Sequence, residues 1–314
     1  MRKVIFSFGL AMCSVVVAVT IGLKAVGMSP TNFSANIGVG TGMGAKLACS
    51  GHFLSGFDED QIRNDLASYS PAIDLFNITL DEQAGKATVD LLGLFNTSAT
   101  YREGIGCTLD QSDMTVIDGL EPPAEPKLDK NSLWPEGPRV REPDSRLVET
   151  LSLSLTQDQE QGLQTRALIM VQGGRIVAEV YAPEITPDTP LMGWSQGKSL
   201  TALIVGWLEQ QGLISVLERN LFPQWNEDER TEISVKNLLH MSSGLDFDEV
   251  YTPGSDATRM LFMDTVVSGV PLQSALSEAP GTHFYYSSGT TNLLTLLFNE
   301  RVGGPQNALN HLYQ

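Results

Sequence analysis

The stretch from Leu191 to Gly212 constrains the fold more than any other part of the sequence. Its apolar residues recur with the period of a helix, and no formal charge occurs between Lys198 and Glu209, which predicts a helix that is buried nearly all round. The glycine at its end is a residue type that commonly stops a helix. Ser195 and Lys198 are three residues apart in the first turn, so they share one face and their side chains can meet.

A lysine beside such an apolar helix is costly to bury unless it is paired or neutral. A neutral Lys198 would be a base able to activate the serine one turn away as a nucleophile. Ser-x-x-Lys is a short pattern that also arises by chance. It therefore leaves open that Ser195 only caps the helix and that Lys198 is a surface lysine.

Composition bounds the class of protein. The chain has 314 residues, of which 42% are hydrophobic, enough for one large domain or two smaller ones. The formal net charge of −17 argues against nucleic acid and anionic membrane surfaces as partners. The histidines have no ligand-like spacing to the cysteines, so no metal site is predicted, and no cofactor is predicted either.

The amino terminus predicts export. Met1-Arg2-Lys3 precedes an apolar run from Val4 to Leu23 that is long enough to span a bilayer, and the basic start places this end in the cytoplasm. Residues 1–27 are therefore interpreted as a signal anchor in the inner membrane, with the remainder facing the periplasm or the cell exterior. A cleaved signal peptide is the alternative, with Ala25 and Gly27 at the cleavage site.

Residues 28–121 are predicted to form an extension or cap region. The glycines from Gly38 to Gly44 indicate a flexible tether, followed by a helix over 58–69 and strands near 86–95 and 98–101. Cys49 and Cys107 lie outside the apolar run, and an even pair in an oxidising compartment is expected to form a disulfide.

A proline-rich connection is predicted over 122–145, followed by the main domain over 146–314. Within that domain, Gly173-Gly174 between two apolar runs predicts a hairpin. Three further segments complete the pattern, a short helix with a turn at Leu238–Leu245, a turn and loop at Pro280–Ser288, and a second buried helix over Thr291–Phe298.

The order of the hairpin, the Ser195-Gln-Gly-Lys198 helix start, the 238–245 turn and the 280–288 segment resembles the β-lactamase-related serine hydrolases. These include class C β-lactamases, DD-peptidases, and the esterases and amide hydrolases of that fold, among them 6-aminohexanoate-dimer hydrolases. The resemblance covers the chain from about Leu163 to its end. It implies an α/β (α+β) fold, in which helices flank a β-lactamase/transpeptidase-like antiparallel sheet, here preceded by the membrane helix.

The resemblance also assigns roles. Ser195 matches the family's nucleophile, Lys198 its lysine base, and Tyr286 the tyrosine of a Tyr-x-Asn motif, with Tyr285 as a rival. Ser288 stands where the family often has a substrate-contacting asparagine, which argues against efficient β-lactamase action and for ester or amide cleavage. Either Lys198 or Tyr286 could deprotonate Ser195, a dispute known for related enzymes.

The family's third motif, Lys-Thr-Gly or His-x-Gly, does not occur after Tyr286. We therefore expect the sheet to be incomplete at its carboxyl-terminal end, as in the first part of a longer enzyme. The sequence predicts a serine hydrolase that cleaves a small-molecule ester, amide or peptide through an acyl-enzyme. A non-catalytic remnant or binding module of the same fold is the alternative.

Overall fold

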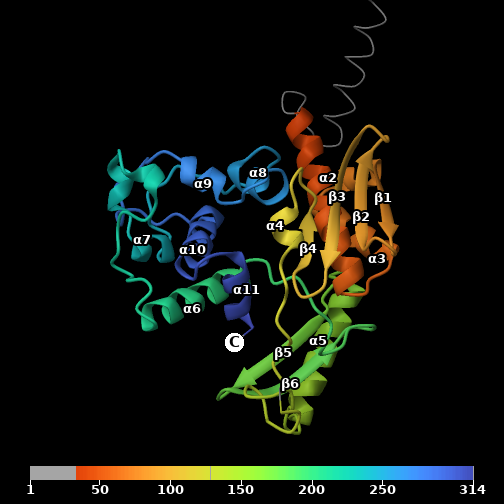
Figure 1. Cartoon of the computed structure of the whole chain (residues 1–314). Helices are drawn as coiled ribbons and strands as arrows, with labels where there is room; N and C mark the ends of the chain where they lie inside the picture. Colours follow the sequence, from red (N-terminus) through yellow and green to blue (C-terminus); the bar gives the residue numbers. More distant parts are fainter. Residues whose placement is uncertain (1–32, 128, 314) are drawn as a thin grey trace, which may run out of the picture. The chain divides into compact units, whose positions relative to one another are not determined.

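The computed structural model describes residues 33–127 and 129–313, which contain antiparallel sheets and helices in a mixed α/β arrangement (Figure 1). Contacts divide the chain into two compact units. One comprises the described residues up to Pro123 together with Met192–Leu312, and the other centres on 124–191. These divisions differ from the boundaries at 121 and 145 that changes of composition indicate, and the predicted domains stay a prediction.

The predicted membrane segment over 1–27 lies outside the described residues. Among the helices that the structure does describe, none combines the length and apolarity needed to cross a membrane.

The first unit contains a four-stranded antiparallel sheet in the order β1-β2-β3-β4. Its strands and the neighbouring helical segments are β1 (Phe76–Asp81), β2 (Lys86–Leu91), β3 (Phe95–Arg102), β4 (Gly106–Leu109), α2 (Phe33–Cys49), η2 (Ser50–Leu54), α3 (Glu59–Tyr69), η3 (Pro71–Leu75) and α4 (Thr115–Asp118). Helix α2 lies along one face of the sheet (Figure 1). Alternate strand residues such as Ile78, Val89 and Ala99 are buried there, as period-2 alternation dictates.

Helix α2 occupies the segment expected to be a flexible tether, so that expectation is wrong. Its glycines are points of close packing: a Cβ at Gly40 would lie 2.8 Å from Cζ of Phe76, and one at Gly42 would lie 2.1 Å from the carbonyl oxygen of Phe262. The helix therefore approaches its neighbours closely because these positions carry no side chain, which outweighs the low helix propensity of glycine.

The disulfide between Cys49 and Cys107 joins the end of α2 to β4. Beside it, Lys46 Nζ donates a 2.6 Å hydrogen bond to the carbonyl of Cys107, and burial lowers the pKa of Lys46. The disulfide therefore fixes α2 to the sheet at the carboxyl end of the helix.

The rest of the first unit is helical. Its elements are α6 (Gln196–Gln210), η4 (Pro223–Trp225), η5 (Glu229–Glu232), α7 (Val235–Leu239), α8 (Asp256–Phe262), α9 (Gly269–Gln273), α10 (Ser288–Arg301) and α11 (Pro305–Leu312). The predicted buried helix is confirmed as α10, which contacts each of these α-helices. Leu293, Leu294 and Leu297 pack in one core with Leu208 of α6 and Leu238 of α7.

The sequence predicts that α6 is buried on nearly every side. This prediction is wrong. Only Val205 and Leu208 are buried, whereas Leu200 is 55% exposed and Leu203 72% exposed. Within the first unit α10 is its main partner and covers one stripe of the helix. An apolar sequence predicts burial only where neighbouring elements are present to cover it.

The second unit contains helix α5 (Ser145–Glu160) and the hairpin of β5 (Ala167–Gln172) and β6 (Arg175–Tyr181). The predicted hairpin is confirmed. Gly173 and Gly174 have φ of +58° and +71°, the two positive values that a tight hairpin turn requires and glycine adopts without strain. Asp144 caps α5 through hydrogen bonds from two backbone N–H groups, and α5 packs mainly against β6.

Candidate active site

Ser195 sits at the amino end of α6, where the chain turns sharply into the helix. Trp194 before it has φ of +43°, a left-handed value that is uncommon for a bulky residue and costs energy. The carbonyl groups of Gly193 and Trp194 accept hydrogen bonds from the N–H groups of Gln196 and Gly197. This turn leaves the Ser195 side chain exposed.

Three predicted side chains meet here. The Tyr286 hydroxyl donates a 2.7 Å hydrogen bond to Ser195 Oγ, and Lys198 Nζ donates to the same oxygen at 3.4 Å. Lys198 Nζ also lies 4.8 Å from the centroid of the Tyr286 ring, within the range of a cation–π contact. A hydroxyl nucleophile with two proton-carrying groups in reach is the arrangement that acyl transfer requires.

The hydroxyl that reaches Ser195 belongs to Tyr286, and its rival Tyr285 instead donates its backbone N–H to the carbonyl of Met241 at 2.8 Å. Gly281 N–H donates to the carbonyl of Ser242 at 2.8 Å. These two bonds attach the 280–288 segment to the turn after α7. That turn therefore holds Tyr286 in place.

Ser288, the first residue of α10, is the fourth predicted residue of the cluster and is buried. Its hydroxyl donates to Glu249 Oε1 at 2.6 Å, and its N–H donates to Oε2 at 2.6 Å. Lys198 Nζ donates to the same hydroxyl oxygen at 3.0 Å. The carboxylate thus lies at the amino end of a helix, where the helix dipole favours negative charge.

Glu249 and Tyr251 were not predicted from the sequence. Tyr251 hydroxyl lies 3.4 Å from Ser288 Oγ, so both residues adjoin the cluster. They come from an irregular stretch between the 238–245 turn and α8, which has no helical or strand periodicity. The acidic residues of that stretch gave no signal that distinguishes one carboxylate from the next.

The donor and acceptor roles around Lys198 follow from these contacts. Since the Ser288 hydroxyl gives its proton to Glu249, its oxygen is left to accept from Lys198. Lys198 is therefore a donor to both Ser288 and Ser195, through the N–H groups of its amine. Of the two groups in reach of Ser195, Tyr286 is the closer.

The other predicted site residues, Cys49 and Cys107, form the disulfide of the sheet region and do not contribute to this cluster. In the described residues, no group of three or more His, Cys, Asp or Glu side chains is placed to hold a metal ion.

Comparison with known proteins gives the family of the part of the chain that carries this cluster. Residues 152–307 match the family model "Beta-lactamase", and this range includes Ser195, Lys198, Glu249, Tyr286 and Ser288. With the motifs in the expected order, the match places this part of the chain in the β-lactamase-related serine hydrolase family. No curated protein matches the chain.

One similar solved structure is the "Putative 6-aminohexanoate-dimer hydrolase from Bacillus anthracis", at 16% sequence identity and a TM-score of 0.37. The similarity covers 48% of this chain and 44% of that one. The chain therefore spans less than half the length of the structure that it matches.

Proposed function

We propose that this chain is a serine hydrolase that cleaves an ester or amide bond of a small molecule or peptide through an acyl-enzyme on Ser195. One observation carries the proposal: Ser195 Oγ lies 2.7 Å from Tyr286 Oη and 3.4 Å from Lys198 Nζ. The family of residues 152–307 supports hydrolase chemistry in general, and the contacts of the cluster support this particular route.

In the proposed reaction, Ser195 Oγ attacks the carbonyl carbon while its proton passes to Tyr286 Oη. Tyr286 is assigned as the acceptor because its hydroxyl oxygen is the nearer of the two groups, 2.7 Å from Ser195 Oγ against 3.4 Å for Lys198 Nζ. In this proposal Tyr286 first releases to solvent the proton that it donates to Ser195 Oγ in the resting structure, and the nearby Lys198 charge stabilises the resulting negative oxygen. In this proposal the Ser195 N–H, at the start of α6, donates to the oxyanion.

The intermediate then collapses. The C–O or C–N bond breaks, the leaving group takes the proton from Tyr286, and the acyl group remains on Ser195. A water molecule attacks this ester and gives a proton to Tyr286. Tyr286 then passes a proton to Ser195 Oγ as the carboxylic acid departs. The products are a carboxylic acid and an alcohol or amine, so one water is consumed in each turnover.

The proposal is tested by labelling the purified protein with a fluorescent alkyl phosphonate, and separately with a fluorescent penicillin. We expect the phosphonate to label the protein covalently at Ser195, and Ser195→Ala to abolish labelling. Ser199→Ala, an exposed serine on the next turn of α6, is the matched control and should label normally. A folded protein that reacts with neither reagent would instead support the non-catalytic alternative.

We also propose that the protein is exported and anchored in the inner membrane with its site facing the periplasm or cell exterior. The Cys49–Cys107 disulfide supports this, because such bonds persist in oxidising compartments. Thiol labelling of denatured protein recovered from the cell envelope tests it. Cys49 and Cys107 should be unreactive until a reductant is added, and two reactive thiols without reductant would contradict export.

A further inference from the structure

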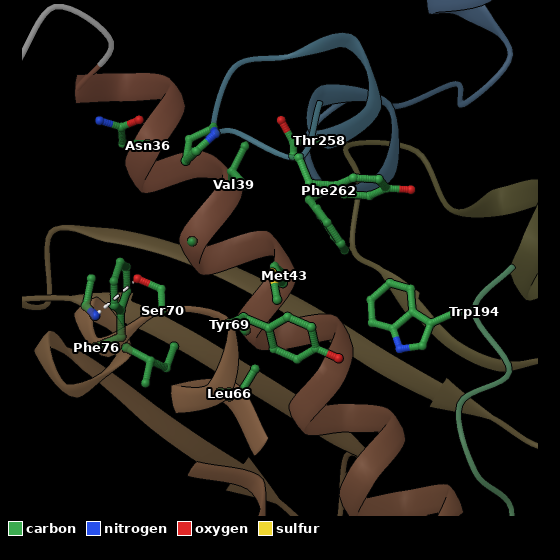
Figure 2. Close-up of a pocket in the computed structure, with 16 residues that line it drawn as sticks. Asn36, Val39, Met43, Leu66, Tyr69, Ser70, Phe76, Trp194, Thr258 and Phe262 are labelled. Carbon is green, nitrogen blue, oxygen red and sulfur yellow. Dashed lines mark hydrogen bonds between the residues drawn. The ribbon is translucent and has the colours of Figure 1, made fainter. Parts of the chain in front are cut away.

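A cavity of about 620 Å³ adjoins the catalytic cluster within the first unit. Its walls come from α2, the end of α3, η3, the start of β1, Trp194, and α8 with the loop before it (Figure 2). Figure 2 shows Val39 and Met43 of α2 and Phe262 of α8 on its sides, with Tyr69 and Trp194 beside one another. The volume lies in the range of cavities that hold small ligands.

The cavity and the nucleophile share two pieces of chain. Trp194, which lines the cavity, immediately precedes Ser195 and packs against Tyr69 with ring centroids 5.9 Å apart. Tyr251 also lines the cavity, and its hydroxyl is 3.4 Å from the Ser288 oxygen that accepts from Lys198. A substrate whose carbonyl lies at Ser195 can therefore place another of its groups in this cavity.

The strained turn at Trp194 has a role in this arrangement. Its φ of +43° is unfavourable for a tryptophan. The same turn puts the serine at the start of α6 and the indole in the cavity wall. Strain of this kind is found where a binding or catalytic geometry is held by the surrounding structure.

The walls carry no formal charge, because none of the lining residues is Asp, Glu, Lys, Arg or His. Two polar side chains are engaged locally: Ser70 accepts from the N–H of Ala72, and Thr258 donates to the carbonyl of Thr252. Partial burial raises the pKa of Tyr251, so its hydroxyl stays neutral at physiological pH. An apolar group gains free energy on entering such a cavity, whereas a charged group loses its hydration without a partner.

We propose that this cavity binds a bulky apolar group, an alkyl chain or an aromatic ring, of the ester or amide that Ser195 cleaves. The inference rests on the proposed function and specifies its substrate class. The apolar group can belong to the acyl part or to the leaving group, and the experiment distinguishes these two sources.

Two ester series supply the test. The first consists of 4-nitrophenyl esters from acetate to octanoate, and the second of alkyl acetates from ethyl to octyl. We expect kcat/KM to rise along one series, by up to about fourfold for each methylene that becomes buried. A rise with acyl length assigns the cavity to the acid part, and a rise with alkyl length assigns it to the alcohol part.

Met43→Trp fills the cavity and should lower the ratio of kcat/KM for the longest to the shortest ester of that series at least tenfold. Tyr69→Ala, at a half-exposed position, removes part of the cavity wall and should lower the same ratio. This variant adds no bulk to the core. Leu94→Trp, which enlarges a side chain that is 74% exposed and outside the cavity, is the control and should leave the ratio unchanged. Melting temperatures of all three variants show that they are folded.

Failure of this inference differs from failure of the proposed function. If Ser195 hydrolyses short esters but neither series gains with length, the inference is overturned and the function stands.

The inactive Ser195→Ala variant should bind the neutral apolar fluorophore N-phenylnaphthylamine saturably, and Met43→Trp in that background should weaken binding at least tenfold. Binding without any hydrolysis or labelling by the Ser195 form would overturn the proposed function, and with it the substrate assignment.

Discussion

Helices α6 and α10 each carry one side of the proposed catalytic cluster, but they are held in opposite ways. Ser195 and Lys198 lie at the start of α6, which buries only two side chains. Ser288 opens α10, on which seven residues are buried. The comparison separates the proposed chemistry from stability. Helix α10 is a structural centre that also bears a candidate site residue, whereas α6 mainly supports the proposed nucleophile.

The difference follows from the number of neighbours. Helix α10 is packed by α6, α7, α8, α9 and α11, whereas α6 in the same unit packs mainly against α10. Each buried leucine or phenylalanine contributes roughly 1.5–3 kcal/mol relative to exposure. The stability of the helical region therefore depends on α10. Four sets of substitutions test the contrast between the two helices, from the largest expected effect to the smallest.

The largest expected effect is on activity at the first turn of α6. Ser195→Ala should abolish ester hydrolysis, and Lys198→Ala or Tyr286→Phe should lower kcat by several powers of ten, because a catalytic unit fails when one member is lost. The Ser195→Ala/Lys198→Ala double variant should lose no more than Ser195→Ala alone. Thermal melts should shift little for Ser195→Ala, since its side chain is exposed. Wild-type turnover by Lys198→Ala would refute its assigned role.

The second effect is on stability. Leu293→Ala in α10, at a side chain with no exposed surface, should lower the free energy of unfolding by about 2–5 kcal/mol. Leu203→Ala makes the same change in α6, where the side chain is 72% exposed. Apart from the small difference in helix propensity, it should lower the free energy of unfolding by no more than about 0.5 kcal/mol. Urea unfolding of both variants measures the difference. Equal losses would show that the outer face of α6 is covered in the protein.

The third effect is a loss of stability when a glycine of α10 is replaced by alanine. A Cβ at Gly289 of α10 would lie 2.8 Å from Cδ2 and Cε2 of Phe247 and 3.0 Å from Cβ of Pro271. Phe247 is 3% exposed and has little room to move. Gly289→Ala should therefore destabilise the protein by about 1–3 kcal/mol as an overpacked site. Phe247→Leu in the same background should recover part of the loss, and no recovery would contradict the steric explanation.

Several parts of this fold were predictable because local residues determine them. The hairpin depends on two glycines with positive φ, and α7 follows from a capping box between Ser234 and Asn237. The motif residues Ser195, Lys198, Tyr286 and Ser288 were all named from the sequence, and the structure brings them into contact. The resemblance of their order to that of the β-lactamase-related serine hydrolases was sufficient to select these residues without knowledge of the packing.

The errors concern packing against distant residues. Helix α2 was interpreted as a tether because glycine-rich segments are typical of flexible linkers, but its glycines make room for Phe76 and Phe262, which lie far along the chain. Similarly, the apolar composition of α6 gave no information about how many elements would cover it. Glu249 was missed because its role depends on the backbone and hydroxyl of Ser288 and on no pattern around the glutamate itself.

The smallest expected effect reverses the sign found at Gly289. Gly206 lies in the middle of α6, is exposed, and would place a Cβ with no atom within 4 Å. Alanine there loses less backbone entropy on folding, so Gly206→Ala should stabilise the protein by roughly 0.5–1 kcal/mol. Gly212→Ala is the control, since its Cβ would also meet no atom within 4 Å but its φ is +69°, and it should cost about 1 kcal/mol. Thermal melts at matched concentration measure both changes. Destabilisation by Gly206→Ala, with Gly212→Ala behaving as expected, would show that a neighbour packs closely on this face of α6, and the contrast with α10 would then be lost.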